Sequence, residues 1–191
     1  MTQSLTYWQF FIALESDLEV TSRFVEPVTA NFAAYSVAFA QLILGAGSEI
    51  DVISKLLCDG IDPTSRAKNI NDYRQIIHPK FPRYHALEVQ VPRYSLTVTP
   101  WSEWGCGSNP EWWQAYNGIK HERHNNYALA NLKNAVNAVA GLFVAVLYLY
   151  HKELRGNQLQ PWPKILSLNP SWNSRIRNDL RPGYTLPDFQ S

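Results

Sequence analysis

The chain has 191 residues, of which 46% are hydrophobic and 13% aromatic. That composition is sufficient for one domain with a sizeable core, and it excludes a globally disordered chain. The formal net charge is +1, so no overall field attracts nucleic acid and any nucleic-acid site must be a local patch.

Cysteine spacing and the uncharged stretches bound the class of protein further. Cys58 and Cys106 form no CxxC or Cys/His pattern, so we expect no metal or other cofactor, and two reduced thiols rather than a disulfide. The N-terminus lacks the features of a signal peptide. The uncharged stretches 27–48 and 134–150 contain polar residues and much alanine, which favours core helices over membrane spans. We therefore expect a cytoplasmic protein with no membrane contact.

Apolar residues at helical spacing predict two helices in the first third of the chain, over 5–24 and 31–58. The first ends before Pro27, because the residue preceding a proline is pushed away from the helical region. Gly45 and Gly47 weaken the second helix. Such glycines indicate that another backbone packs close by.

The period of the sequence then changes from helical to alternating. A short helix is predicted over 69–78, followed by alternation of apolar and polar residues in 87–91 and 94–98. Pro92 interrupts the alternation, as in an edge strand or a kinked ribbon. We place a small β ribbon within 84–100.

Two further helices are predicted over 110–122 and 127–154, the first capped by Ser108 or Asn109. The fold class is therefore mainly α: a bundle of four to five helices over 1–156, with a small β insertion before the fourth helix. Residues 157–191 form an irregular arm that packs on the bundle or on a partner. The last helix is apolar almost all round, so it is central or covered by a partner. A homodimer is predicted on this basis.

Polar and basic side chains converge at the end of the fourth helix, in "EWWQAYNGIKHERHNN". Asn117, Lys120, His121 and His124 share one helical stripe, and Arg123 follows Lys120 by three residues. A structural interpretation is also open, because cations at a helix C-terminus stabilise the helix itself.

These residue types also suit metal-independent RNA cleavage. Histidine can move a proton near neutral pH, and arginine or lysine can stabilise a phosphorane. We assign His121 as the proton-transfer group and Arg123, assisted by Lys120, as the phosphate-stabilising cation. The supporting residues are assigned as Asn117, Tyr116, His124 and Glu49, the last as a carboxylate that orients a base of the fourth helix. Zinc is disfavoured, since nothing near His121 and His124 completes a ligand set.

The long apolar helices, the polar "NGIKHERHNN" junction and the uncharged last helix resemble the HEPN superfamily. Members of that superfamily are compact α-helical domains, many of them RNA-cleaving toxins or antiviral effectors, and they act as dimers that pool two copies of an Arg-x4-6-His motif. Arg123 is followed by a polar residue, as the motif prefers, but Ala128, Leu129 and Ala130 stand where its histidine falls. The motif is a variant or degenerate one.

The resemblance implies a HEPN-like protein that binds or cleaves RNA without a metal, in prokaryotic antiviral defence or a toxin–antitoxin system. Its partners would be RNA, a second copy of the chain, and a protein partner or antitoxin. The alternative is a non-catalytic helical interaction module whose polar junction contacts another protein.

Overall fold

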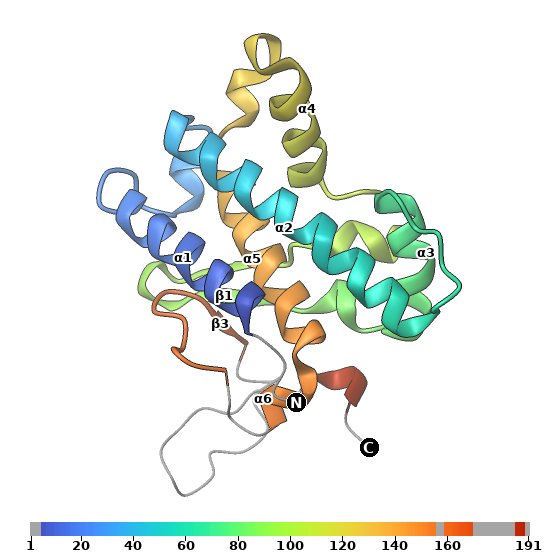
Figure 1. Cartoon of the computed structure of the whole chain (residues 1–191). Coiled ribbons are helices and arrows are strands. Elements are labelled where there is room, and N and C mark those ends of the chain that lie inside the picture. The colour runs from blue at the N-terminus through green and yellow to red at the C-terminus, as the bar shows by residue number, and fades with distance from the viewer. Residues whose placement is uncertain (1–4, 156–158, 170–185, 190–191) are drawn as a thin grey trace, which may run out of the picture.

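The computed structural model describes residues 5–155, 159–169 and 186–189. It confirms the predicted fold class, a mainly helical bundle with a small β ribbon before the fourth long helix (Figure 1). The helices are α1 (Thr6–Thr21), α2 (Val37–Ile61), α3 (Ile70–Lys80), α4 (Glu111–Asn126), α5 (Leu132–Leu149) and the short α6 (His151–Arg155).

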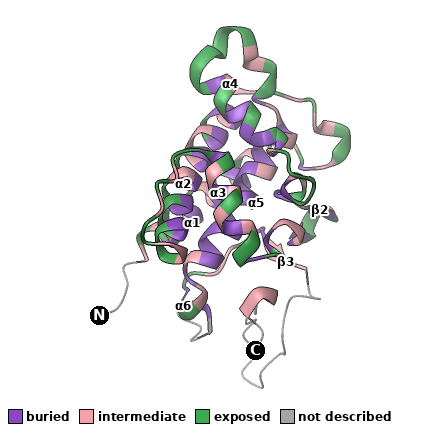
Figure 2. Cartoon of the chain, turned by 90° about the vertical axis from the view of Figure 1, so that its right-hand side faces the viewer, coloured by how far each residue is buried: buried purple, intermediate pink, exposed green. Residues whose placement is uncertain are grey.

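Helix α5, which carries no charged residue after Lys133, lies at the centre of the bundle. It packs against α1, α2 and α4, and its most extensive contact is with α2. Buried residues occur on every side of it, including Leu142, Phe143 and Val146 (Figure 2). The apolar pattern of α5 is thus satisfied within one chain, and the homodimer inferred from that pattern stays a prediction.

Two of the described helices, α2 and α5, are long and apolar enough to cross a membrane by length and composition alone. In the fold, 83% of the most apolar window of α5 and 50% of that of α2 are buried inside the protein. The core helix of a globular protein has these same properties, so the two helices are weak evidence for a membrane span.

Two glycines of α2 allow close approach of neighbouring helices. A Cβ on Gly47 would lie 2.4 Å from the ring of Tyr116 in α4, and one on Gly45 would lie 3.1 Å from Leu14 of α1. The close approach expected from the sequence is present, but side chains make it rather than a backbone. Gly47 therefore allows the Tyr116 ring to lie directly on α2.

The sheet has three antiparallel strands in the order β2-β1-β3. The predicted ribbon supplies β1 (Val89–Val91) and β2 (Leu96–Val98), with Val89 opposite Val98. The other edge of β1 pairs with β3 (Ser167–Leu168), which belongs to the C-terminal segment. Strand β3 has only two residues, too few to show an alternation of apolar and polar side chains, so the sequence did not predict it.

Several helix boundaries differ from the prediction. Helix α2 begins at Val37, six residues later than expected, because the Ser36 hydroxyl caps it by accepting the Phe39 N–H at 3.1 Å. Helix α5 begins at Leu132, where Asn131 provides the cap. Neither predicted cap serves α4, whose N-cap is Pro110, because the Asn109 side chain bonds to α3 instead.

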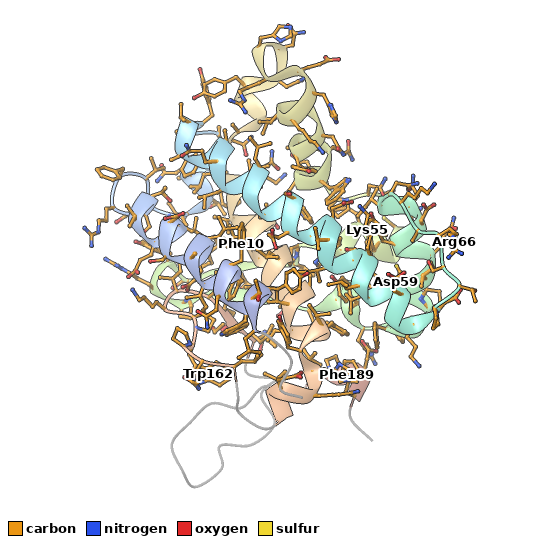
Figure 3. The ribbon with its side chains drawn as sticks, in the orientation of Figure 1. Phe10, Lys55, Asp59, Arg66, Trp162 and Phe189 are labelled. Atoms are coloured by element: carbon orange, nitrogen blue, oxygen red, sulfur yellow. The ribbon has the colours of Figure 1, made fainter. Side chains whose placement is uncertain are left out.

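Two carboxylates help to fasten the C-terminal segment to the bundle, in addition to the pairing of β3 with β1. The carboxylate of Glu15, 1% exposed in α1, accepts the backbone N–H groups of Ile165 at 2.6 Å and Leu166 at 3.2 Å. Farther along, Asp188 accepts the hydroxyl of Tyr148 at 2.6 Å. Figure 3 places Trp162 and Phe189 of this segment at the lower end of the molecule. Residues 157–158, 170–185 and 190–191 of the predicted arm lie outside the described residues.

The contact between Gly47 and Tyr116 generates a stability prediction. We expect Gly47→Ala to lower the free energy of unfolding, because overpacking a core costs about 1–3 kcal/mol and exceeds the gain of up to about 1 kcal/mol from replacing a helical glycine. Gly45→Ala is the matched control: its new methyl meets only the flexible end of Leu14, so stability should be unchanged or higher. Urea unfolding measures both, and equal losses would contradict this packing.

Glu15 generates a prediction about pH. Burial raises the pKa of its carboxyl above the ordinary 4.5, against the opposing effect of its backbone hydrogen bonds. A carboxyl with a raised folded-state pKa contributes stability that is present below the unfolded pKa and is lost as the pH rises through the folded pKa. From about pH 4 to about pH 7, the unfolding free energy of the wild type should therefore fall relative to that of Glu15→Gln.

Asp17→Asn is the control for this comparison, since Asp17 is an exposed carboxyl of the same helix. Denaturant unfolding across the pH range measures all three proteins. If the wild type and Glu15→Gln kept a constant difference over that range, the buried carboxyl would have no raised pKa.

Candidate functional site

The second half of α4 projects beyond the other helices, at the top of Figure 1. Lys120 and the five residues after it are all exposed (Figure 2). The helix is broken at Glu122, whose backbone angles are φ −140° and ψ 50°. The predicted end of the helix at this residue is where the regular backbone stops, and the chain turns back toward α5. We call residues 117–127 the tip.

Local contacts fold the chain back on itself at the tip. The Asn126 amide donates to the carbonyl of Glu122 at 3.1 Å, and more distantly to that of Gly118 at 3.5 Å. A Cβ on Gly118 would lie 3.2 Å from the side chain of Leu129 and 3.4 Å from that of Asn126. A glycine at this position therefore allows the returning chain to pack closely against the helix.

An open hollow lies at the tip, and we call it the basic hollow. Its lining is Ile119, Lys120, His121, Arg123, His124 and Tyr127, a set with four basic side chains and no acidic one. The side chains of His121, Arg123 and His124 make no hydrogen bond or ion pair with any described residue. The acidic residue of the tip, Glu122, is exposed and does not line the hollow.

A second hollow, which we call the amide hollow, lies between α2, α4 and the start of α3. Its lining is Asp51, Lys68, Asn69, Ile70, Asn71, Trp113, Tyr116, Asn117 and Lys120. Lys120 lines both hollows. Its ammonium donates to the hydroxyl of Tyr116 at 3.2 Å and lies 5.3 Å from the centre of that ring. The two hollows therefore meet at Lys120.

Six of the seven predicted site residues line one of the two hollows, and Glu49 lines neither. Lys120, His121, Arg123 and His124 share the basic hollow. Tyr116 and Asn117 line the amide hollow. The Asn117 amide donates to the Trp113 carbonyl at 3.2 Å, so it is engaged within its own helix.

Glu49 does not make the contact to α4 that was predicted for it. Gly47 faces Tyr116 of α4, whereas Gly45 faces Leu14 of α1. Because residues four apart share a helix face, Glu49 lies on the side of Gly45. Its carboxylate makes no hydrogen bond or ion pair with a described residue, and burial raises the pKa of that carboxyl. Its position faces away from the tip.

Sequence reasoning missed two parts of the site. Tyr127 lines the basic hollow, although it comes directly after the polar junction and was read as the first residue of the next helix. Lys68 and Asn69 reach the amide hollow from the start of α3. Only the tertiary packing of α3 against α2 brings them there, so no local pattern could have found them.

The basic hollow is suited to binding anions. Lysine and arginine side chains are cationic donors that bind phosphate and carboxylate oxygens. Among the described residues, no group of three or more His, Cys, Asp or Glu side chains is arranged to hold a metal ion. The side chains that line the basic hollow can bind an anion, and its two histidines can transfer a proton.

Comparisons with known proteins add no family. A scan against protein-family models found no match, and searches of curated proteins and of solved structures found no significant match. The resemblance to the HEPN superfamily rests on the residues of the polar junction and on the pattern of apolar helices.

Proposed function

We propose that this protein binds RNA through the tip of α4. The observation that carries the proposal is the basic hollow, where Lys120, Arg123 and two histidines gather without an acidic neighbour in the lining. On a chain with a net charge of only +1, such a cluster is a local positive patch of the kind that contacts phosphates.

The bonding state of these side chains supports a ligand more than a structural role. In the described part of the chain, Lys55, Lys133 and Lys164 form ion pairs with Asp51, Glu111 and Glu19. Arg123 has no such partner, and it lies beyond the break at Glu122. Arg123 directly follows the end of the regular helix, where the dipole also favours a cation, so the support for a ligand comes from its open position in the basic hollow without an acidic partner.

The amide hollow extends the surface along which a nucleic-acid strand can run. Lys120 belongs to both hollows, and the second adds the cation Lys68 and the amide of Asn71, beside the carboxylate of Asp51, which is paired with Lys55. Lysine and asparagine side chains are common donors to phosphate and sugar oxygens. A strand bound at the tip can thus continue toward the start of α3 without leaving polar surface.

Metal-independent cleavage of the bound RNA is a second candidate function. His121 and His124 line the same hollow as Arg123, so a general base, a general acid and a phosphate-stabilising cation are available together. The HEPN resemblance points the same way. No described residue hydrogen-bonds either imidazole, however, so the geometry supports binding more directly than catalysis.

The binding proposal is tested by removing the cations. We expect Lys120→Ala and Arg123→Ala each to weaken binding of an unstructured RNA oligomer, and to reduce the slope of log affinity against log salt by about 0.7 per lost phosphate contact. Lys80→Ala is the matched control, because Lys80 is an exposed lysine at the far end of α3. Fluorescence anisotropy at several salt concentrations measures all four proteins.

Two outcomes would count against RNA binding. One is a wild-type protein without measurable affinity for RNA at low salt. The other is an equal loss in Lys80→Ala, which would indicate a diffuse charge effect. If the folded wild type bound no RNA, the helical interaction module, with the tip contacting another protein, would become the leading function.

The cleavage candidate has its own test, incubation of the protein with total RNA in the presence and absence of EDTA. If the chain is a ribonuclease, we expect EDTA to leave cleavage intact and His121→Ala to slow it by about 10²- to 10⁴-fold, the usual effect of losing an acid–base group. The helical circular-dichroism signal should be unchanged, because His121 is exposed. An unchanged rate in His121→Ala would reject the assignment of His121.

A further inference from the structure

An aromatic wall borders the basic hollow. Tyr127 is one of the residues that line it, and the ring of Tyr35 meets the Tyr127 ring edge-on, with centroids 5.5 Å apart and planes at 82°. Tyr35 is 56% exposed. Tyrosine rings placed beside the cations Lys120 and Arg123 on an open surface form a combination that the packing of the core does not require.

Backbone pairing holds Tyr35 in this place. The segment before α2 runs antiparallel to the segment before α5, with Tyr35 opposite Asn131. The Ser36 N–H donates to the Ala130 carbonyl at 3.1 Å, and the Leu132 N–H donates to the Ala34 carbonyl at 2.9 Å. Tyr35 is thus fixed on both sides of its backbone and presented beside the tip by tertiary structure.

The wall continues as apolar surface. Val37 is 63% exposed and Leu129 is 37% exposed, and these residues adjoin Tyr35 and Tyr127 along the chain. Leu129 also packs against Gly118 of the tip. Exposed apolar side chains therefore lie close in the chain to the two tyrosines, of which Tyr127 lines the basic hollow.

We propose that Tyr127, supported by Tyr35, stacks an unpaired base of the RNA whose phosphates the basic hollow holds. This inference rests on the proposed function and names its ligand as single-stranded RNA. Proteins that bind single strands combine a positive groove with aromatic side chains on which bases stack. A base inside a duplex is already stacked and paired, so its face is closed to a side chain.

The first measurement needs no variant. Anisotropy compares an oligoadenosine, an abasic ribose-phosphate oligomer of equal length, and a duplex of equal length. Stacking is worth about 1–3 kcal/mol per base, so the oligoadenosine should bind roughly 5- to 150-fold more tightly than the abasic oligomer. A 2-aminopurine placed in the strand should lose fluorescence on binding.

The second measurement uses Tyr127→Ala and Tyr127→Phe, with Tyr94→Ala as the matched control. Tyr94 is a half-buried tyrosine beside Arg93, whose guanidinium lies 5.4 Å from its ring centre, on the β ribbon. We expect Tyr127→Ala to lose the preference for oligoadenosine over the abasic oligomer and to bind the abasic oligomer like the wild type. Tyr127→Phe and Tyr94→Ala should keep the preference.

Failure of this inference is distinguishable from failure of the proposed function. Equal wild-type affinity for the oligoadenosine and the abasic oligomer would overturn stacking while leaving phosphate binding intact. Failure to bind any of the three would overturn both. If Tyr127→Ala does not fold, an unquenched 2-aminopurine on the wild type still rejects stacking. Binding to a protein or to anionic vesicles, with no binding to RNA, would assign the wall to a different partner.

Discussion

The need to bury α5 on every side is the constraint on which the rest of the structure depends. No charged residue occurs between positions 134 and 150, so exposure of any face of the helix would leave apolar surface in water. Helices α1, α2 and α4 cover it. Because α5 begins only at Leu132, after the turn Tyr127–Leu129, the second half of α4 extends past the end of the helix it covers. The tip is exposed because α4 reaches farther than the end of α5 against which it packs.

The first turn of α4 is fixed to the core by the side chain of Trp112, in contrast to the exposed tip. Trp112 donates its ring N–H to the Pro100 carbonyl at 2.6 Å, and its ring meets that of Trp101 at 89°. Trp101 in turn donates to the carbonyl of Gly141 in α5 at 3.1 Å. Buried indole groups with satisfied donors are rigid anchors. The side chains of the tip therefore stand on a helix whose root is fixed to the centre of the bundle.

Local pattern predicted those parts of the molecule that depend on one segment alone. Helical spacing found the five longer helices, and the alternation around Pro92 found the ribbon. The late starts of α2 and α5 were missed because the segments before them pair with each other through backbone hydrogen bonds, and no periodicity records such pairing. The contact expected between Glu49 and α4 is absent for a related reason. Which helix each side of α2 faces is set by tertiary packing, as the contacts of Gly45 and Gly47 show.

The fastening of residues 165 and 166 to Glu15 has a consequence for synthesis of the chain. These residues lie 150 positions after their acceptor, so at ribosomal rates Glu15 exists for roughly 8 to 30 seconds before its donors are made. During that interval a buried carboxylate without donors would be costly, and the edge of β1 that later pairs with β3 is open to other strands. A prematurely terminated chain would keep the helices of the bundle, yet it would carry an unsatisfied acid and an unprotected edge. Residues 165–168 thus supply the donors for Glu15 and cover the edge of β1, and a fragment that lacks them would be prone to aggregation.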